Sequence, residues 1–116
     1  MAHYHYTIKE NPISLNDWYA GKHWTVRKKQ KDRWYAIFKE VLDNNIPNIK
    51  KEYRIKMHVN SRHDPSNVIT MIKIFEDTLK KLGYIIDDSP KYCKGITIEP
   101  HPDLEKPSFN LVLESL

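Results

Sequence analysis

Residues 64–83, D-P-S-N-V-I-T-M-I-K-I-F-E-D-T-L-K-K-L-G, contain the clearest structural signal of the chain. Asp64 and Pro65 suit the N-cap and the first position of a helix, and Gly83 suits the position just after its end. Apolar residues recur between them at helical spacing, at Val68, Ile72, Phe75, Leu79 and Leu82. We therefore predict an amphipathic helix here, with one face packed against a core.

Working outward from this helix, the apolar residues alternate in some segments and follow helical spacing in another. In residues 53–59 every second side chain is apolar, which is typical of a half-buried strand. The predicted elements in chain order are a strand at 3–8, a helix at 27–43, a strand at 53–59, the helix described above, a short buried strand at 84–86, and strands at 92–98 and 109–113. The order β-α-β-α-β-β-β predicts an α+β fold, with a small mixed sheet and two main helices.

Length and composition limit what the chain can be. Its 116 residues and 13.9 kDa suit one domain spanning 1–116, and one cysteine excludes an internal disulfide. No apolar run approaches the ~20 residues that span a bilayer. Because MAHYHYTIKE has no apolar leader region, we expect a cytoplasmic protein without a membrane partner. With three glycines and no phosphate-binding loop, we expect no nucleotide cofactor.

Positive charge is concentrated in one segment. The chain carries a net charge of +4, and residues 21–33 alone carry +5. The cations of this segment are Lys22, Arg27, Lys28, Lys29, Lys31 and Arg33. Trp18, Tyr19, His23 and Trp24 lie beside them, and cations interleaved with rings suit a nucleic-acid backbone and unstacked bases. A solvated helix face with its aromatic residues turned inward explains the same pattern, and both interpretations stay open.

Acidic residues frame the helix at 64–83. Asp64 stands at its start, and Asp87 and Asp88 follow its end. Helical geometry places Lys73 and Asp77 together on the side away from the core. If strand 84–86 packs beside strand 53–59, Asp88 comes near Asp64, and carboxylates from different elements are what Mg²⁺ requires.

Each of these features also has a purely structural explanation. Asp64 fits an N-cap, the Lys73 and Asp77 pair fits a surface ion pair, and Asp87-Asp88-Ser89-Pro90 fits a turn. The combination of several acids, one lysine and a separate basic segment favours a site.

The strings D-P-S-N (64–67) and G-Y-I-I-D-D-S (83–89), with Lys73 and Asp77 between them, resemble the RusA family of Holliday junction resolvases. The opening P-I-S-L-N-D-W-Y (12–19) is similar to the start of that family. The resemblance implies a small homodimeric α+β endodeoxyribonuclease that cuts four-way DNA junctions with Mg²⁺ or Mn²⁺.

The resemblance also assigns roles to individual residues. It makes Asp64 and Asp88 metal ligands, Asp87 the partner of Asp88, Lys73 the essential lysine and Asp77 the helix aspartate. The matching DNA-binding positions are Arg62, His63 and Asn67, which join Lys22, Arg27, Lys28, Lys29 and Lys31 of the basic segment.

One departure from the family is Ser66, which stands where the family has a second aspartate. A hydroxyl adds no negative charge, so the metal site should be weaker. A slower nuclease, recruitment of Asp77 or Asp87 as a substitute, and junction binding without cutting are all compatible with this change. The alternative function is therefore a catalytically weak or inactive protein that binds branched or single-stranded DNA. A protein-interaction domain without a nucleic-acid role is a third interpretation.

Overall fold

The computed structural model describes residues 2–14, 24–61, 63 and 65–116, without the side chains of residues 65 and 66. The elements are β1 (His3–Ile8), α2 (Trp24–Asn44), β2 (Tyr53–Asn60), the 3-10 turn η1 (Pro65–Val68), α3 (Ile69–Lys81), β3 (Cys93–Pro100) and β4 (Ser108–Ser115). The predicted α+β fold with two main helices is confirmed. No helix in the described part of the chain is long and apolar enough to cross a membrane.

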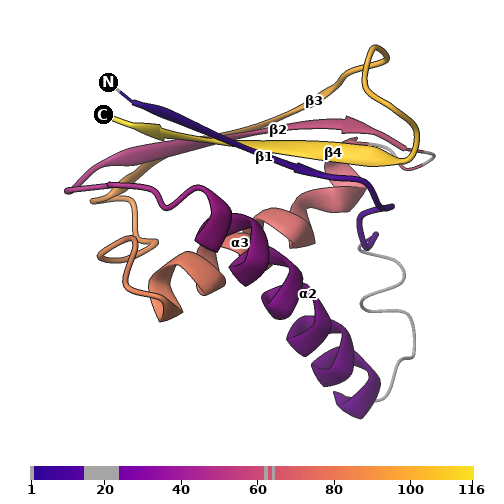
Figure 1. Ribbon diagram of the computed structural model, residues 1–116, viewed down its shortest axis with the longest axis horizontal. Coiled ribbons are helices and arrows are strands. Elements are labelled where there is room, and N and C mark those ends of the chain that lie inside the picture. The colour runs from indigo at the N-terminus through magenta and orange to yellow at the C-terminus, as the bar shows by residue number, and fades with distance from the viewer. Residues whose placement is uncertain (1, 15–23, 62, 64) are drawn as a thin grey trace.

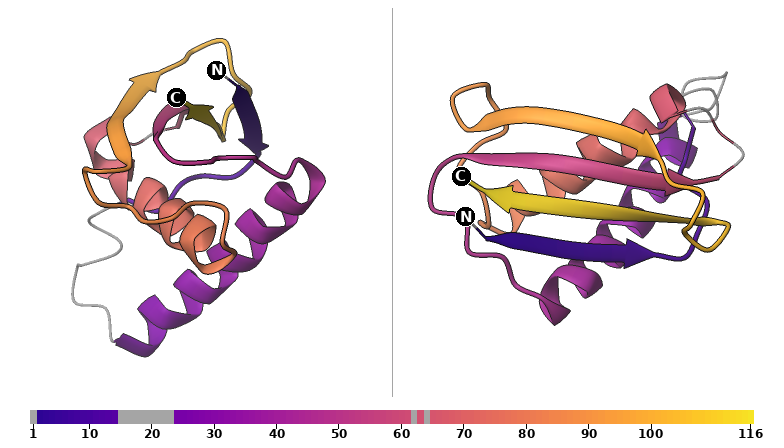
Figure 2. Two further views of the ribbon diagram at one scale, coloured as in Figure 1. Left: turned by 90° about the vertical axis from the view of Figure 1, so that its left-hand side faces the viewer. Right: turned by 90° about the horizontal axis from the view of Figure 1, so that it is seen from above.

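The four strands form one mixed sheet in the order β1-β4-β2-β3. β4 runs antiparallel to both β1 and β2, whereas β3 runs parallel to β2, with Tyr53 opposite Cys93. Both helices lie on the same face of this sheet, and no helix of the described residues covers the other face (Figures 1 and 2). The core therefore lies between the sheet and the two helices.

The core is built from the apolar periodicities of the sequence. Every second residue of β2, beginning with Tyr53, is buried, as the alternation predicts. Phe75 of α3 packs against Tyr6 of β1 and Phe38 of α2, with ring centroids 5.8 and 5.3 Å apart. α3 is thus enclosed by the sheet on one side and by α2 on the other, which buries most of its circumference.

The predicted strand at 84–86 is wrong. These residues form bends, and only Ile85 of the three is buried. The place beside β2 is taken by β3 instead. The backbone N–H of Tyr84 donates to the carbonyl of Leu79 (2.8 Å), and Gly83 has a φ of +78°. These are features of a helix C-terminus, so residues 83 and 84 terminate α3 and do not start a strand.

Candidate functional site

The exposed side of α3 carries the first part of the candidate site. Lys73 and Asp77 stand one helical turn apart and form an ion pair of 3.4 Å, as the spacing predicts. The neighbouring positions of α3 face the core, so polar side chains of this helix that reach solvent are confined to this narrow side. Lys80 lies a further turn along the same side.

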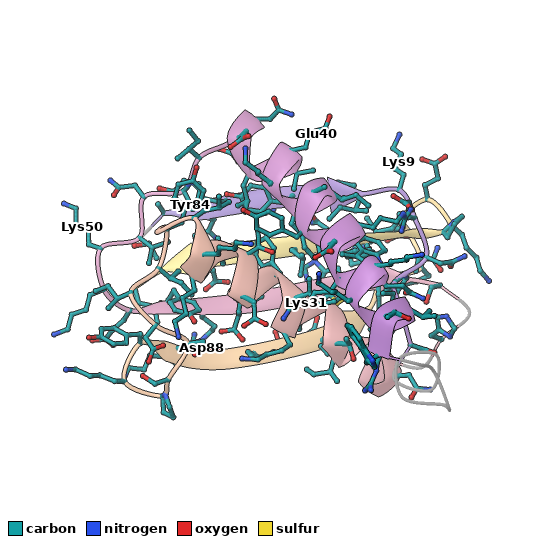
Figure 3. All side chains as sticks on the ribbon, turned by 90° about the horizontal axis from the view of Figure 1, so that it is seen from below. Lys9, Lys31, Glu40, Lys50, Tyr84 and Asp88 are labelled. Carbon is teal, nitrogen blue, oxygen red and sulfur yellow. The ribbon has the colours of Figure 1, made fainter. Side chains whose placement is uncertain are left out.

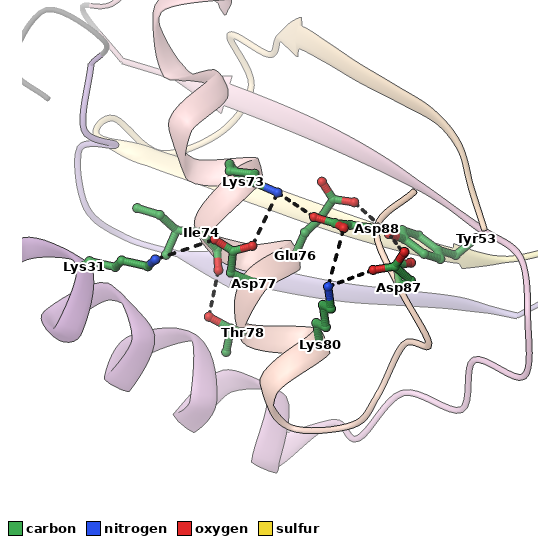
Figure 4. A network of polar contacts seen from close by, with 10 residues as sticks. All are labelled: Lys31, Tyr53, Lys73, Ile74, Glu76, Asp77, Thr78, Lys80, Asp87 and Asp88. Atoms are coloured by element: carbon green, nitrogen blue, oxygen red, sulfur yellow. Dashed lines mark hydrogen bonds and ion pairs between the residues drawn. The ribbon is translucent and has the colours of Figure 1, made fainter. Parts of the chain in front are cut away.

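The segment 82–92 brings two aspartates onto these lysines. Lys73 Nζ donates to Asp88 Oδ2 at 2.5 Å, and Lys80 Nζ lies 2.8 Å from Asp87 Oδ1 and 4.0 Å from Asp88 Oδ1 (Figure 4). The sequence predicted that a strand at 84–86 would position Asp88. The Asp88 carboxylate instead contacts the lysines of α3, because the chain turns back along the helix after Gly83.

These contacts change the proton affinities of the groups that make them. Hydrogen bonds to Asp88 and to Asp87 raise the pKa of Lys73 and of Lys80, respectively, above the ordinary lysine value. The hydrogen bond from Lys80 lowers the pKa of Asp87 to about 2. At neutral pH Lys73 and Lys80 therefore stay protonated and Asp87 stays ionised.

α2 is joined to the same cluster through one cation of the basic segment. Lys31 Nζ lies 3.8 Å from Asp77 Oδ2, and it points from α2 toward α3 (Figure 4). The result is a row of alternating charges that runs from α2 across α3 to the segment 82–92: Lys31, Asp77, Lys73, Asp88, Lys80 and Asp87. Because exposed ion pairs contribute about 0–1 kcal/mol each, this row stabilises the fold only modestly.

A buried acidic residue, Glu76, lies behind this row and was not among the site residues predicted from the sequence. Glu76 is only 5% exposed, and the hydroxyl of Tyr53 donates to its carboxylate at 2.7 Å. Burial raises the pKa of Glu76, the Tyr53 hydrogen bond opposes that rise, and the charge of Asp88 adds to it. The burial of Glu76 could have been predicted from its spacing in the helix. Glu76 follows Ile72 by four residues and precedes Leu79 by three, which places a charged residue beside the apolar stripe.

Residues 24–33 of the basic segment form the first half of α2. Arg27 is half-buried, whereas Lys28 and Lys29 are exposed, and none of these three forms an ion pair with another described residue. In Figure 1 this half of α2 extends away from the sheet. Figure 3 places Lys31 on the helical face of the molecule together with Asp88.

Several predicted site residues lie outside the described residues, namely Lys22, Arg62 and Asp64, as do the aromatic positions 18, 19 and 23. The side chain of Ser66 is also outside them. His63 and Asn67 are half-buried, and the backbone N–H of His63 donates to Ser61 Oγ at 3.1 Å. The approach of Asp64 to Asp88 was predicted from a strand at 84–86 beside β2, and the structure does not form that strand. Because Asp64 lies outside the described residues, the approach itself stays a prediction.

The donor chemistry around Asp88 suits a hard cation, because all the acidic ligand atoms nearby are carboxylate oxygens. The described residues on their own do not complete such a site: they contain no group of three His, Cys, Asp or Glu side chains arranged to hold a metal ion. Asp88 would bind the ion together with a ligand from outside that set, such as Asp64, and the Lys73 ammonium would have to share or yield its place on Asp88.

Neither a protein-family model nor a curated protein matches this chain. The resemblance to the RusA family consequently rests on the motif residues themselves.

Proposed function

We propose that this chain is a Mg²⁺-dependent endodeoxyribonuclease that resolves four-way DNA junctions as a RusA-like homodimer. The observation that carries the proposal is the row of alternating charges from Lys31 to Asp87, which joins the basic half of α2 to the acids named by the resemblance. A nuclease needs these two properties side by side, because cations hold the DNA backbone while carboxylates hold the metal ion.

Each residue of the site has a role in this proposal. Asp64 and Asp88 hold the ion, and Asp87 or Asp77 assists them. Bound Mg²⁺ supplies the Lewis acidity that activates water and polarises the scissile phosphate. Lys73 offers its ammonium to the negative charge that develops on the phosphate. An entering phosphate gives Lys73 a partner other than Asp88, which leaves the Asp88 oxygens available to a cation.

The arms of the junction are bound by the exposed half of α2 in this proposal. Arg27, Lys28 and Lys29 make no ion pair with a described residue, so they can neutralise phosphates without first breaking such a contact. Two coordinated cuts in a four-way junction require two sites related by a twofold axis, which is why we expect a homodimer.

The test compares cleavage of a synthetic four-way junction with cleavage of a linear duplex of the same sequence, in Mg²⁺. We expect Asp88→Asn to lower junction cleavage more than about 100-fold, because the loss of a ligand exceeds the 10–100-fold effect of outer-shell changes. Asp43→Asn is the matched control, since Asp43 is also paired with a lysine, Lys39, at 2.9 Å but lies on α2 outside the row. Equal cleavage of linear duplex and junction would rule out a resolvase.

A titration with Mn²⁺ separates the nuclease from its alternative. The nuclease predicts uptake of Mn²⁺ by the unaltered chain and its loss in Asp88→Asn, followed by isothermal titration calorimetry. Absence of uptake, combined with junction binding that is the same in both chains, would favour a protein that binds branched DNA without cutting it. The fact that lysines engage both Asp87 and Asp88 is the observation that favours this alternative.

A further inference from the structure

Two lysines of α3 hold the Asp88 carboxylate by its two oxygens. Lys73 Nζ lies 2.5 Å from Asp88 Oδ2, and Lys80 Nζ lies 4.0 Å from Asp88 Oδ1 (Figure 4). The two lysines are seven residues apart, which is close to two helical turns, so α3 presents both on the same side. Each oxygen of this carboxylate therefore has a positive charge beside it.

Lys80 is not among the residues to which the resemblance assigns a role, yet it contacts both aspartates. Its Nζ lies 2.8 Å from Asp87 Oδ1 as well as 4.0 Å from Asp88 Oδ1. The Lys80 side chain is 51% exposed and that of Lys73 is 61% exposed. A phosphate oxygen arriving from solvent can thus reach both ammonium groups without displacing side chains of the core.

These ion pairs oppose the binding of either ligand alone. A divalent cation brought to Asp88 is repelled by two ammonium groups that lie within 4.0 Å of the same carboxylate. A phosphate brought to Lys80 is repelled by the aspartates to which this lysine is already paired. Each ligand therefore has to break ion pairs before it gains contacts of its own.

The two ligands together remove this obstacle. The charges of Lys73, Lys80, Asp87 and Asp88 cancel one another, so a cation alone or a phosphate alone leaves some of these groups beside a like charge. With both ligands bound, the aspartates face the cation and the lysines face the phosphate. Each ligand then strengthens the binding of the other by the same factor, because such coupling is reciprocal.

We propose that Lys80 is a second phosphate-binding lysine of this site, and that the ion pairs of Lys73 and Lys80 close Asp87 and Asp88 to a cation until a DNA phosphate draws the lysines away. Cation and DNA consequently bind cooperatively. The identity of the two ligands rests on the proposed function, which this inference deepens.

The first test measures Mn²⁺ affinity without DNA, by calorimetry, in Lys80→Gln and Lys81→Gln. Both variants lose one positive charge from α3, but Lys81 lies over the ring of Tyr35, with Nζ 4.3 Å from the ring centroid. We expect Lys80→Gln to bind Mn²⁺ about three- to fivefold tighter than the unaltered chain, the effect of one exposed ion pair. Lys81→Gln should bind Mn²⁺ within about twofold of the unaltered chain, since exposed charges farther away are screened by salt.

The second test measures junction affinity in EDTA, by fluorescence anisotropy, in Asp87→Asn and Asp43→Asn. Each variant removes one negative charge and releases one lysine, Lys80 in the first and Lys39 in the second, from pairs of 2.8 and 2.9 Å. We expect Asp87→Asn to bind the junction about threefold tighter than Asp43→Asn, because the released Lys80 lies in the site. Adding Lys80→Gln to Asp87→Asn should remove this gain. Equal affinities in the two aspartate variants, or a gain that survives without Lys80, would overturn the role of Lys80.

The Mn²⁺ series also separates this inference from the proposed function. If the unaltered chain binds Mn²⁺ and Lys80→Gln binds it no tighter than Lys81→Gln, the inference is wrong and the proposed nuclease stands. If none of the three chains binds Mn²⁺, the proposed nuclease fails together with the part of the inference that concerns the cation. The junction measurements then still decide whether Lys80 binds phosphate.

Discussion

The two helices of this protein have opposite relations to the core. α3 is short, and it is buried at eight of its thirteen residues because the sheet covers one side of it and α2 another. α2 is twenty-one residues long but buries only Trp34, at its centre, and Phe38 and Leu42, in its second half. The first half of α2 extends beyond the sheet and carries the basic residues.

This difference explains where the candidate site and the exposed basic residues of α2 lie. On α3 only a narrow exposed side remains, so Lys73, Asp77 and Lys80 stand close together and meet the aspartates of the segment 82–92. On α2 no residue before Trp34 is buried. Charge there can be spread around the helix, which suits an extended partner better than a small one.

We expect the greatest loss of stability when the packing of the second half of α2 against the core is removed. Phe38 has no exposed surface and contacts the rings of Trp34, Phe75 and Phe109. Phe38→Ala should therefore lower the free energy of unfolding by about 3–5 kcal/mol, measured by urea denaturation. Val26→Ala, in the exposed half of the same helix, should change it by less than about 0.5 kcal/mol. Similar losses in both variants would contradict the division of α2 into two halves.

A medium effect is expected on DNA binding by the first half of α2. Affinity for DNA falls as salt rises, so the slope of log affinity against log salt is negative. The double variant Lys28→Ala/Lys29→Ala should make this slope less steep by about 2, because each phosphate contact contributes about 0.9. Lys50→Ala/Lys51→Ala removes the same charge from two exposed residues that precede β2. Lys50 lies away from that half of α2 (Figure 3). Fluorescence anisotropy with a labelled junction gives both slopes, and equal slopes would show that net charge alone matters.

The smallest expected effect concerns the exposed side of α3. The pKa of Asp87 is lowered from 3.8 to about 2, so its ionised form is favoured by folding. This contribution is fully present above about pH 4 and is lost as the pH falls toward 2. Asp87→Asn should accordingly lower the melting temperature more at pH 6 than at pH 2, measured by circular dichroism. A difference that stays the same at both pH values would mean that the pair with Lys80 does not cause it.

The fold could be predicted largely because it follows from local periodicity. The alternation in β2 and the helical spacing of Phe75, Leu79 and their neighbours indicate which side chains are buried. This periodicity is sufficient to predict the strands and helices. The strand at 84–86 was predicted wrongly because a run of three apolar residues indicates burial but not the strand or helix against which they pack. That choice depends on β3, which competes for the same edge of β2.

The candidate site divides in the same way. The pairing of Lys73 with Asp77 follows from helix geometry alone and was predictable. The contacts of Asp88 with Lys73, and of Lys31 with Asp77, join residues that are far apart in the chain and depend on how the helices pack.

The α+β class, the faces of the helices and the concentration of positive charge in residues 21–33 follow from the amino-acid order, because each depends on residues close together in the chain. The burial of Glu76 against Tyr53, and the contacts of Asp87 and Asp88 with the lysines of α3, appear only once the chain is folded. Burial and ion pairing depend on which surfaces pack together, and a packed surface is assembled from segments that the chain order keeps apart.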